Sequence, residues 1–171
     1  MQVRQATTGD VDAFRDLRLQ AMTDAPDCFT SSIEREAART PADWARWLAP
    51  AATFLIESTS LGPAALVAAV PDEADPAVVH LAAMWVHPSL RRHGAGRALV
   101  EAVIEWAATV GAQTVRLHVM AGNVPARLLY ERCDFRGTGR ELGGEGGAVV
   151  QVEMERTVSR PHTDEGRRPG G

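Results

Sequence analysis

Two glycines and three arginines stand close together in the middle of the chain, between an apolar run and a run with helical spacing. Gly94 and Gly96 lack a Cβ atom, so an anion can approach the main chain at both positions. Arg91, Arg92 and Arg97 add charged hydrogen-bond donors nearby. A helix that begins after a turn directs free backbone N–H groups and its dipole at an anion. These residue types in this order predict a phosphate-binding turn.

Other interpretations of the two glycines can be compared on the same residues. Taken alone, the pair fits a tight turn with solvated arginines. A dinucleotide-binding fold requires a third glycine, but position 99 is Leu99. A Walker loop ends in Gly-Lys-Ser/Thr, and all 18 basic residues of this chain are arginines. The absence of lysine also excludes Schiff-base chemistry.

The segments before the turn carry clear signals of secondary structure. Runs rich in apolar residues and bounded by turn residues predict strands, and apolar residues at helical spacing predict helices. Thr40 is followed by Pro41 and, two residues later, by Asp43, which is the order of a cap, a first-turn proline and an acidic residue. The expected elements are a strand at 3–6, helices at 10–23 and from 40, and strands at 53–57, 64–70 and 78–86.

The segments after the turn complete one mixed domain. A helix is expected at 96–110, a strand at 114–119, a helix at 125–132, and strands at 136–140 and 148–155 around a glycine-rich turn at 143–147. The order β-α-α-β-β-β-α-β-α-β-β predicts an α/β fold with a mixed central sheet of six to seven strands flanked by helices. We expect residues 1–156 to form the domain and 157–171 to be a disordered tail.

The run from Arg91 to Gly96 resembles the pyrophosphate signature of the GNAT acetyltransferase family, Gln/Arg-x-x-Gly-x-Gly/Ala. This signature follows the fourth strand of the family fold, and the preceding Val86-His87-Pro88 is also similar to the family pattern. Arg92 is a departure, because many members carry glycine there. The contacts to phosphate at this position are expected from the backbone.

A second segment, Asn123 to Phe135, resembles the family pattern Asn-x-x-Ala-x-x-Leu-Tyr-x-x-x-Gly-Phe. Asp134 replaces the usual glycine, and aspartate tolerates the left-handed conformation that often ends a helix. The resemblance covers about residues 3–155 and is most specific from 78 to 135.

The resemblance implies that the protein uses acetyl-CoA as cosubstrate and transfers its acetyl group to a primary amine of a small molecule or peptide. It also implies a separation between the fourth and fifth strands that opens the slot for the pantetheine arm. The residues expected to contact the cofactor are Met84, Trp85, Val86, Arg91, Arg92, His93, Gly94, Ala95, Gly96, Arg97 and Asn123.

Two side chains are the leading candidates for proton transfer. The family tyrosine at the position of Tyr130 points its hydroxyl at the CoA sulfur, which implies a general acid; the alternative is a half-buried core tyrosine. His80 lies eleven residues before Arg91, the spacing at which histone-acetylating members carry their glutamate base. The alternative for His80 is a strand-edge histidine without a role. Further candidates for the base are Glu34, Glu36, Glu57 and His118, although surface or core positions are favoured for each.

Composition limits the remaining classes of function. A net charge of −4 gives no general electrostatic footprint for nucleic acid. Cys28 and Cys133 stand apart from other possible ligands, so we expect no metal site and no disulfide framework. The start of the sequence has no signal-peptide pattern, so we expect a cytoplasmic protein without a membrane partner. A homodimer is possible by resemblance, and the alternative function is a non-catalytic acyl-CoA sensor on the same fold.

Overall fold

A seven-stranded sheet forms the centre of the protein, with strand order β1-β2-β3-β4-β5-β7-β6. The computed structural model describes residues 2–29, 31–48, 52–143 and 150–158. All neighbouring strands are antiparallel except β4 and β5, which are parallel. The strands are β1 (Gln2–Gln5), β2 (Ala52–Ser58), β3 (Gly62–Pro71), β4 (Val78–Val86), β5 (Thr114–Met120), β6 (Arg136–Leu142) and β7 (Gln151–Thr157).

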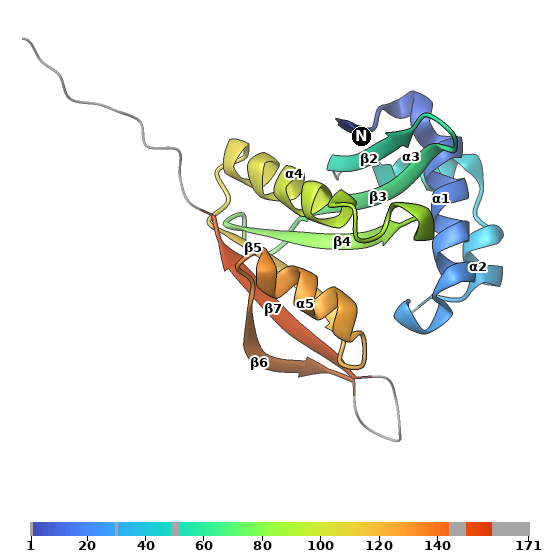
Figure 1. Ribbon diagram of the computed structural model, residues 1–171. Coiled ribbons are helices and arrows are strands. Elements are labelled where there is room, and N and C mark those ends of the chain that lie inside the picture. Colours follow the sequence, from blue (N-terminus) through green and yellow to red (C-terminus); the bar gives the residue numbers. More distant parts are fainter. Residues whose placement is uncertain (1, 30, 49–51, 144–149, 159–171) are drawn as a thin grey trace, which may run out of the picture.

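Helices cover both faces of the sheet (Figure 1). One face carries α1 (Val11–Asp24), α2 (Ile33–Ala37) and α3 (Pro41–Leu48), and the other carries α4 (Ala95–Thr109) and α5 (Val124–Arg132). Short 3-10 turns precede α1 (η1, Thr8–Asp10), follow it (η2, Pro26–Cys28) and lead from β4 toward α4 (η3, Pro88–Leu90).

Each face has its own hydrophobic core. Under α4 and α5, the core joins residues such as Val67, Leu99 and Phe135, all fully buried. Under α1 and α3, a smaller core is built around Phe14 and Trp44, whose rings meet edge to face at 5.8 Å. The site elements at the sheet centre are therefore held from both sides.

The expected α/β fold is confirmed, and most predicted elements are present within a few residues of their predicted ends. The five-residue helix α2 was not predicted, although Ser32 caps it by accepting a hydrogen bond from the Arg35 N–H. The domain extends two residues beyond the predicted boundary, since Thr157 ends β7 and Val158 is buried. The rest of the predicted tail, residues 159–171, and most of the predicted glycine-rich turn, residues 144–149, lie outside the described residues.

A β-bulge in β4 decides which side chains face which core. Ala83 has a φ of 52°, and the register between β3 and β4 shifts at this point. Before the bulge, Leu81 packs under α4; after it, Met84 takes that side and Trp85 packs in the core under α1. A bulge adds one residue to one strand, so the alternation of faces is reversed from Met84 onward.

The same region is where β4 and β5 separate. Their parallel pairing joins only Val78 to Thr114, Val79 to Val115 and His80 to Arg116, although both strands continue beyond these residues. The predicted separation of the fourth and fifth strands is therefore present. A bulge increases local twist and bends its strand, which accounts for the divergence.

Candidate active site

The predicted phosphate turn lies between β4 and α4 and ends in a left-handed glycine. Gly94 is the N-cap of α4 with a φ of 86°, and a Cβ atom built there would meet no heavy atom within 4 Å. Within the described residues, no N–H group of residues 92–97 donates a hydrogen bond of normal length and angle. A helix start leaves such donors free, and they form a site for an anion.

Gly96 also has a packing role that was not predicted. A Cβ atom at this position would lie 2.9 Å from Leu129 Cδ2 and 3.3 Å from Met84 Cε. The missing side chain therefore allows α4 to approach α5 and β4 closely, a contact with neighbouring side chains that the motif alone did not reveal.

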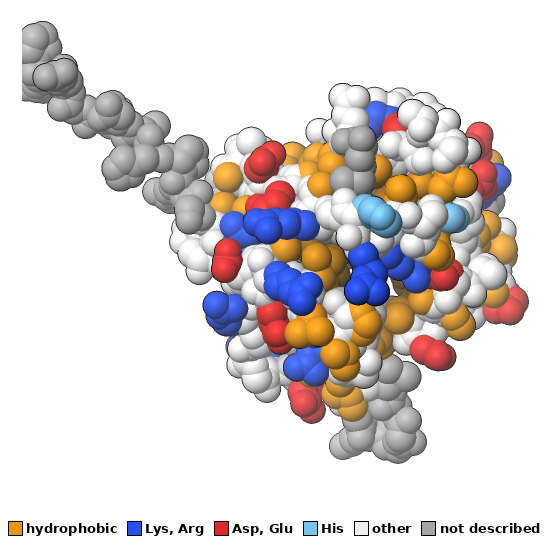
Figure 2. All heavy atoms as spheres, viewed as in Figure 1, with side chains coloured by type: hydrophobic (Ala, Val, Ile, Leu, Met, Phe, Trp, Pro, Cys, Tyr) orange, Lys and Arg blue, Asp and Glu red, His pale blue; other side chains and the backbone are white. Residues whose placement is uncertain are grey.

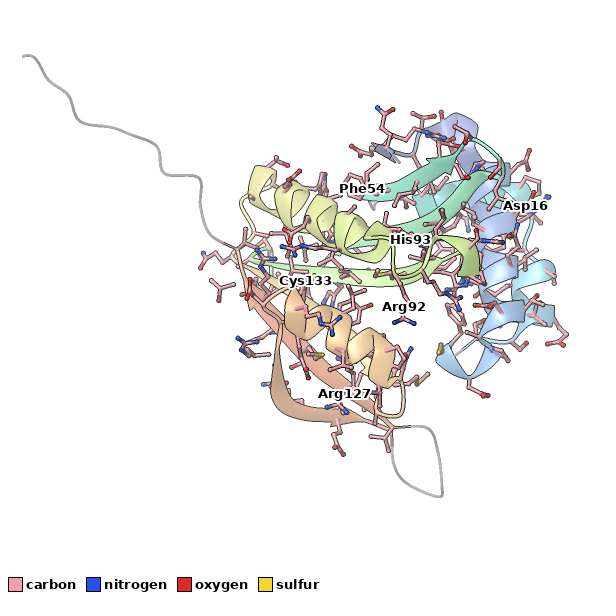
Figure 3. All side chains as sticks on the ribbon, in the orientation of Figure 1. Asp16, Phe54, Arg92, His93, Arg127 and Cys133 are labelled. Carbon is pink, nitrogen blue, oxygen red and sulfur yellow. The ribbon has the colours of Figure 1, made fainter. Side chains whose placement is uncertain are left out.

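The charged residues of the turn point in different directions. Arg91 donates from Nε to the Val86 carbonyl at 2.9 Å and from Nη2 to the Asp24 carboxylate, so its guanidinium is bound by protein. Arg92 has a φ of 65°, in the left-handed region that a glycine would occupy without strain. Figure 3 shows its side chain extending from the turn toward the side where α5 lies.

The other predicted residues of the turn are also on this face. His93 Nδ1 lies 2.8 Å from the Arg91 carbonyl oxygen, Ala95 is buried, and Arg97 is exposed with Glu101 at 4.0 Å. Arginine side chains gather across the middle of the face that carries α4 and α5 (Figure 2). This concentration of positive charge favours a phosphate-containing ligand.

Tyr130 lies on α5 beside the separated part of β4. Its hydroxyl donates to Met84 Sδ at 3.5 Å, and its ring is 5.8 Å from that of Phe135. Burial raises the pKa of Tyr130 above its ordinary value, so the hydroxyl keeps its proton at neutral pH. The structure thus brings the predicted acid and the predicted backbone segment 84–86 together.

The ends of α5 explain how the second motif places Tyr130. Asn123 caps the helix, its Oδ1 accepting from the Ala126 N–H at 3.2 Å and its Nδ2 donating to Cys28 Sγ at 3.3 Å. At the other end, Asp134 has a φ of 64° and the Phe135 N–H donates to the Tyr130 carbonyl. The left-handed conformation expected at Asp134 is therefore present, and it closes a Schellman motif.

The predicted base His80 is not beside Tyr130. It lies on the opposite face from the Met84 side chain, four residues earlier on β4, which is about 13 Å at about 3.3 Å per residue. His80 Nε2 is 2.7 Å from Asp72 Oδ2, and this contact lowers the pKa of Asp72 to about 2. Its ring stacks on that of His118 at 6.3 Å.

His118 belongs to a polar cluster on β5 and β7. Its Nε2 lies 3.5 Å from Glu153 Oε2, and Glu153 also accepts from the Thr138 hydroxyl at 2.7 Å. Burial lowers the pKa of His118, which keeps the ring neutral at pH 7. Extending the β4–β5 register by two residues places His118 level with Ala82, nearer than His80 to the open end of the gap.

The glutamates considered as bases have other partners. Glu36 is only 2% exposed, contrary to the surface position expected for it, and its carboxylate lies 3.6 Å from Arg18 and 3.0 Å from Arg39. Glu57 binds Arg4 at 2.7 Å on the β1–β2 edge, and Glu34 is exposed on α2. None of these three glutamates lies on a strand beside the gap.

In the described part of the chain, no group of three or more His, Cys, Asp or Glu side chains could hold a metal ion. None of its helices is long and apolar enough to cross a bilayer.

Comparisons with known proteins agree with this geometry. Residues 18–135 match the Acetyltransferase (GNAT) family, and the chain therefore belongs to this family of acetyltransferases, whose cosubstrate is acetyl-CoA. Comparison with curated proteins finds no match.

Solved structures with the same fold are distant in sequence. A GNAT-family acetyltransferase from Streptococcus pneumoniae is 20% identical with a TM-score of 0.78, and the match covers 92% of this chain and 99% of that one. An acetyltransferase from Salmonella typhimurium, solved with its cofactor acetyl-CoA, is 17% identical with a TM-score of 0.72, covering 94% and 95%. A ribosomal-protein-alanine N-acetyltransferase from Brucella melitensis is 19% identical with a TM-score of 0.72, covering 92% and 99%. At these identities the likeness shows the fold alone.

Proposed function

We propose that the protein transfers the acetyl group of acetyl-CoA to a primary amine of a small molecule or peptide by direct attack. The observation that carries the proposal is that the free N–H groups of residues 92–97 and the Tyr130 hydroxyl both lie next to Met84. The Met84 side chain lies against Gly96 at the start of α4, and its sulfur accepts the hydrogen bond from Tyr130. A pyrophosphate on the N–H groups and a thioester near the Tyr130 hydroxyl would suit one extended cofactor.

The residues present fit acetyl-CoA in three ways. The open space at the Gly94 Cβ position suits a phosphate oxygen, and Arg92 and His93 lie on the same turn. Along β4, the edge of residues 81–86 that faces β5 is not paired with that strand, which supports hydrogen bonding to the pantetheine amides. Asn123 lies at the start of α5, where its amide group already binds a sulfur atom.

Acetyl-CoA supplies the acetyl group as a thioester. In the net reaction the amine nitrogen loses a proton and the thiol gains one, so the site needs one group for each task. Tyr130 is the proposed acid. Its raised pKa keeps it protonated, and it donates a hydrogen bond where negative charge develops on sulfur. A proton lost by the amine compensates for one passed from the tyrosine.

We propose that the base is one of the two stacked histidines, His80 or His118. Asp72 Oδ2 lies 2.7 Å from His80 Nε2 and accepts a hydrogen bond from it, so Nδ1 is the ring nitrogen proposed to accept a proton. Because His80 is distant from Met84 along the strand, it would act through water or on an acceptor that extends along β4. His118, whose pKa is lowered by burial, lies nearer than His80 to the open end of the gap between β4 and β5.

The first experiment is a thiol-release assay with acetyl-CoA and a panel of polyamines, aminoglycosides, amino acids, aryl amines and N-terminal peptides. Release with one class would support the enzyme and identify the type of acceptor. If acetyl-CoA binds by calorimetry but no amine releases thiol, the non-catalytic acyl-CoA sensor is the better description.

The role of Tyr130 is tested by Tyr130→Phe, which removes only the hydroxyl group. We expect turnover to fall about 100-fold, the typical contribution of a positioned acid, while the acetyl-CoA dissociation constant stays within about twofold. A turnover equal to that of the unaltered protein would show that the hydroxyl only fills the core beside Met84.

A further inference from the structure

We propose that Asp24, the last residue of α1, is a positioning residue that fixes the phosphate turn through Arg91 and Trp85. The inference rests on the proposed function, because it assigns Asp24 to the same acetyl-CoA site. Sequence reasoning did not single out Asp24, which lies 67 positions from Arg91 in the chain.

The contacts of Asp24 connect both ends of the link between β4 and the turn. Its Oδ2 accepts from Trp85 Nε1 at 3.0 Å and from Arg91 Nη2. Arg91 Nε in turn donates to the Val86 carbonyl oxygen at 2.9 Å. The hydrogen bond from Trp85 and then that from Arg91 lower the pKa of Asp24, so the carboxylate is charged at neutral pH. One carboxylate thereby ties the last residues of β4 to the first residue of the turn.

The turn needs support from outside itself. Arg92 has a φ of 65°, and a non-glycine residue in this region is strained and persists only where its surroundings hold it. Among the described residues, His93 bonds only to the Arg91 carbonyl oxygen, and Arg97 lies 4.0 Å from Glu101 on its own helix. In the part of the chain that the structure describes, Arg91 is the one side chain of residues 91–97 with a hydrogen bond to an element beyond β4 and α4.

The other end of this connection is rigid. The residues Phe14, Leu17 and Ala21 of α1 are each about 1% exposed in the core against the sheet. Asp24 follows Ala21 on this helix and lies where α1 meets the end of β4. The guanidinium of Arg91 is directed toward α1, so it serves to hold the turn while the main chain binds the phosphate.

The test compares two carboxylate variants by calorimetry with acetyl-CoA. Asp24→Asn keeps the size of the side chain and an oxygen for Trp85 but removes the charge that holds Arg91. We expect the dissociation constant to rise about three- to tenfold, as for a charged hydrogen bond that is partly open to solvent. Asp10→Asn is the matched control, because it removes the same charge from a carboxylate bound to Arg4 at 2.7 and 3.0 Å, away from the turn. The control should unfold at a lower temperature but bind acetyl-CoA normally.

A double-variant cycle identifies Arg91 as the link. Arg91→Gln should weaken binding about as much as Asp24→Asn, and the two together should weaken it no further, since both break one connection. Binding by Asp24→Asn that equals the control, or that is tighter because Arg91 is released to the phosphate, would overturn the proposal. If the unaltered protein itself fails to bind acetyl-CoA, the proposed function fails as well, which is a different result from normal binding in both variants.

Discussion

The phosphate turn and the histidine pair are two parts of the candidate site with opposite constructions. At the turn, residues 92–97 offer main-chain N–H groups, and the key conformation is that of Gly94 at a φ of 86°. At the pair, His80 and His118 offer side chains from two strands, and their stacking depends on the register of β4 and β5. The donor groups of the turn all come from one short segment, whereas the histidine pair exists only after the sheet has formed.

This difference explains which part a sequence can reveal. A main-chain site can be recognised in the sequence as certain residues at fixed spacing, because only these residues permit a left-handed φ or a close approach. A cluster of side chains has no such sequence pattern, since its members can come from any strands that fold together. Substitutions that change backbone conformation, packing or charge one at a time therefore test this difference.

Among the substitutions that test this difference, the largest effect is expected from Gly94→Asp. It places a carboxylate in the open space where we expect the pyrophosphate, and we expect acetyl-CoA affinity to fall by about 2 kcal/mol or more, about thirtyfold. Calorimetry measures this directly.

The control for this substitution is Gly111→Asp. Gly111 also has a positive φ, of 79°, and also has no heavy atom within 4 Å of a built Cβ, but it lies past the other end of α4. Both variants carry similar strain, so a similar change in affinity for the two would show that Gly94 serves only the backbone and not the phosphate.

Much of the turn and of the second motif could be predicted, because both depend on local rules. The left-handed Asp134 lies where the pattern of residues predicts it, whereas the cap at Asn123 was not predicted. The bulge at Ala83 could not be predicted, since alanine does not favour a φ of 52° and the conformation is imposed by pairing with β3. That bulge decides that Met84, and not Trp85, faces Tyr130.

An intermediate effect is expected from Gly96→Ala, which should change the free energy of unfolding and adds no charge. The added methyl group would lie 2.9 Å from Leu129 Cδ2, and such overpacking costs about 1–3 kcal/mol, partly offset by about 1 kcal/mol of helix propensity. We expect the free energy of unfolding in urea to fall by about 1 kcal/mol. Gly122→Ala, where a Cβ atom meets nothing within 4 Å, should leave it unchanged or slightly raised. Equal stability in the two variants would contradict the packing role of Gly96.

The contacts that sequence reasoning missed are those between elements far apart in the chain. Asp24 reaches Trp85 across 61 positions, and Glu36 lies buried beside Arg18 of another helix. An aspartate at a helix end and a glutamate in a charged run give no local signal of burial or pairing. Only the packing of α1 and α2 against the sheet creates these environments.

The smallest effect is expected at the histidine pair, and it depends on pH. Because burial holds the pKa of His118 below its unfolded value of 6.5, the unfolded chain gains a proton first as the pH falls. The free energy of unfolding should therefore decrease from about pH 7.5 to about pH 5. In His118→Gln this part of the decrease should be absent, a change of less than about 1 kcal/mol.

Chemical unfolding of both proteins across this pH range measures the difference. At the upper pH, the His118 ring is neutral in both the folded and the unfolded protein, so the difference in stability there measures the lost packing against His80. The further change of this difference with pH measures the titration of His118. The opposite result would be that the unaltered protein becomes more stable relative to His118→Gln as the pH falls. It would mean that the folded protein favours protonated His118, with Glu153 outweighing burial. Burial would then not be what keeps the ring neutral, and the proposed role of His118 as the base would lose this support.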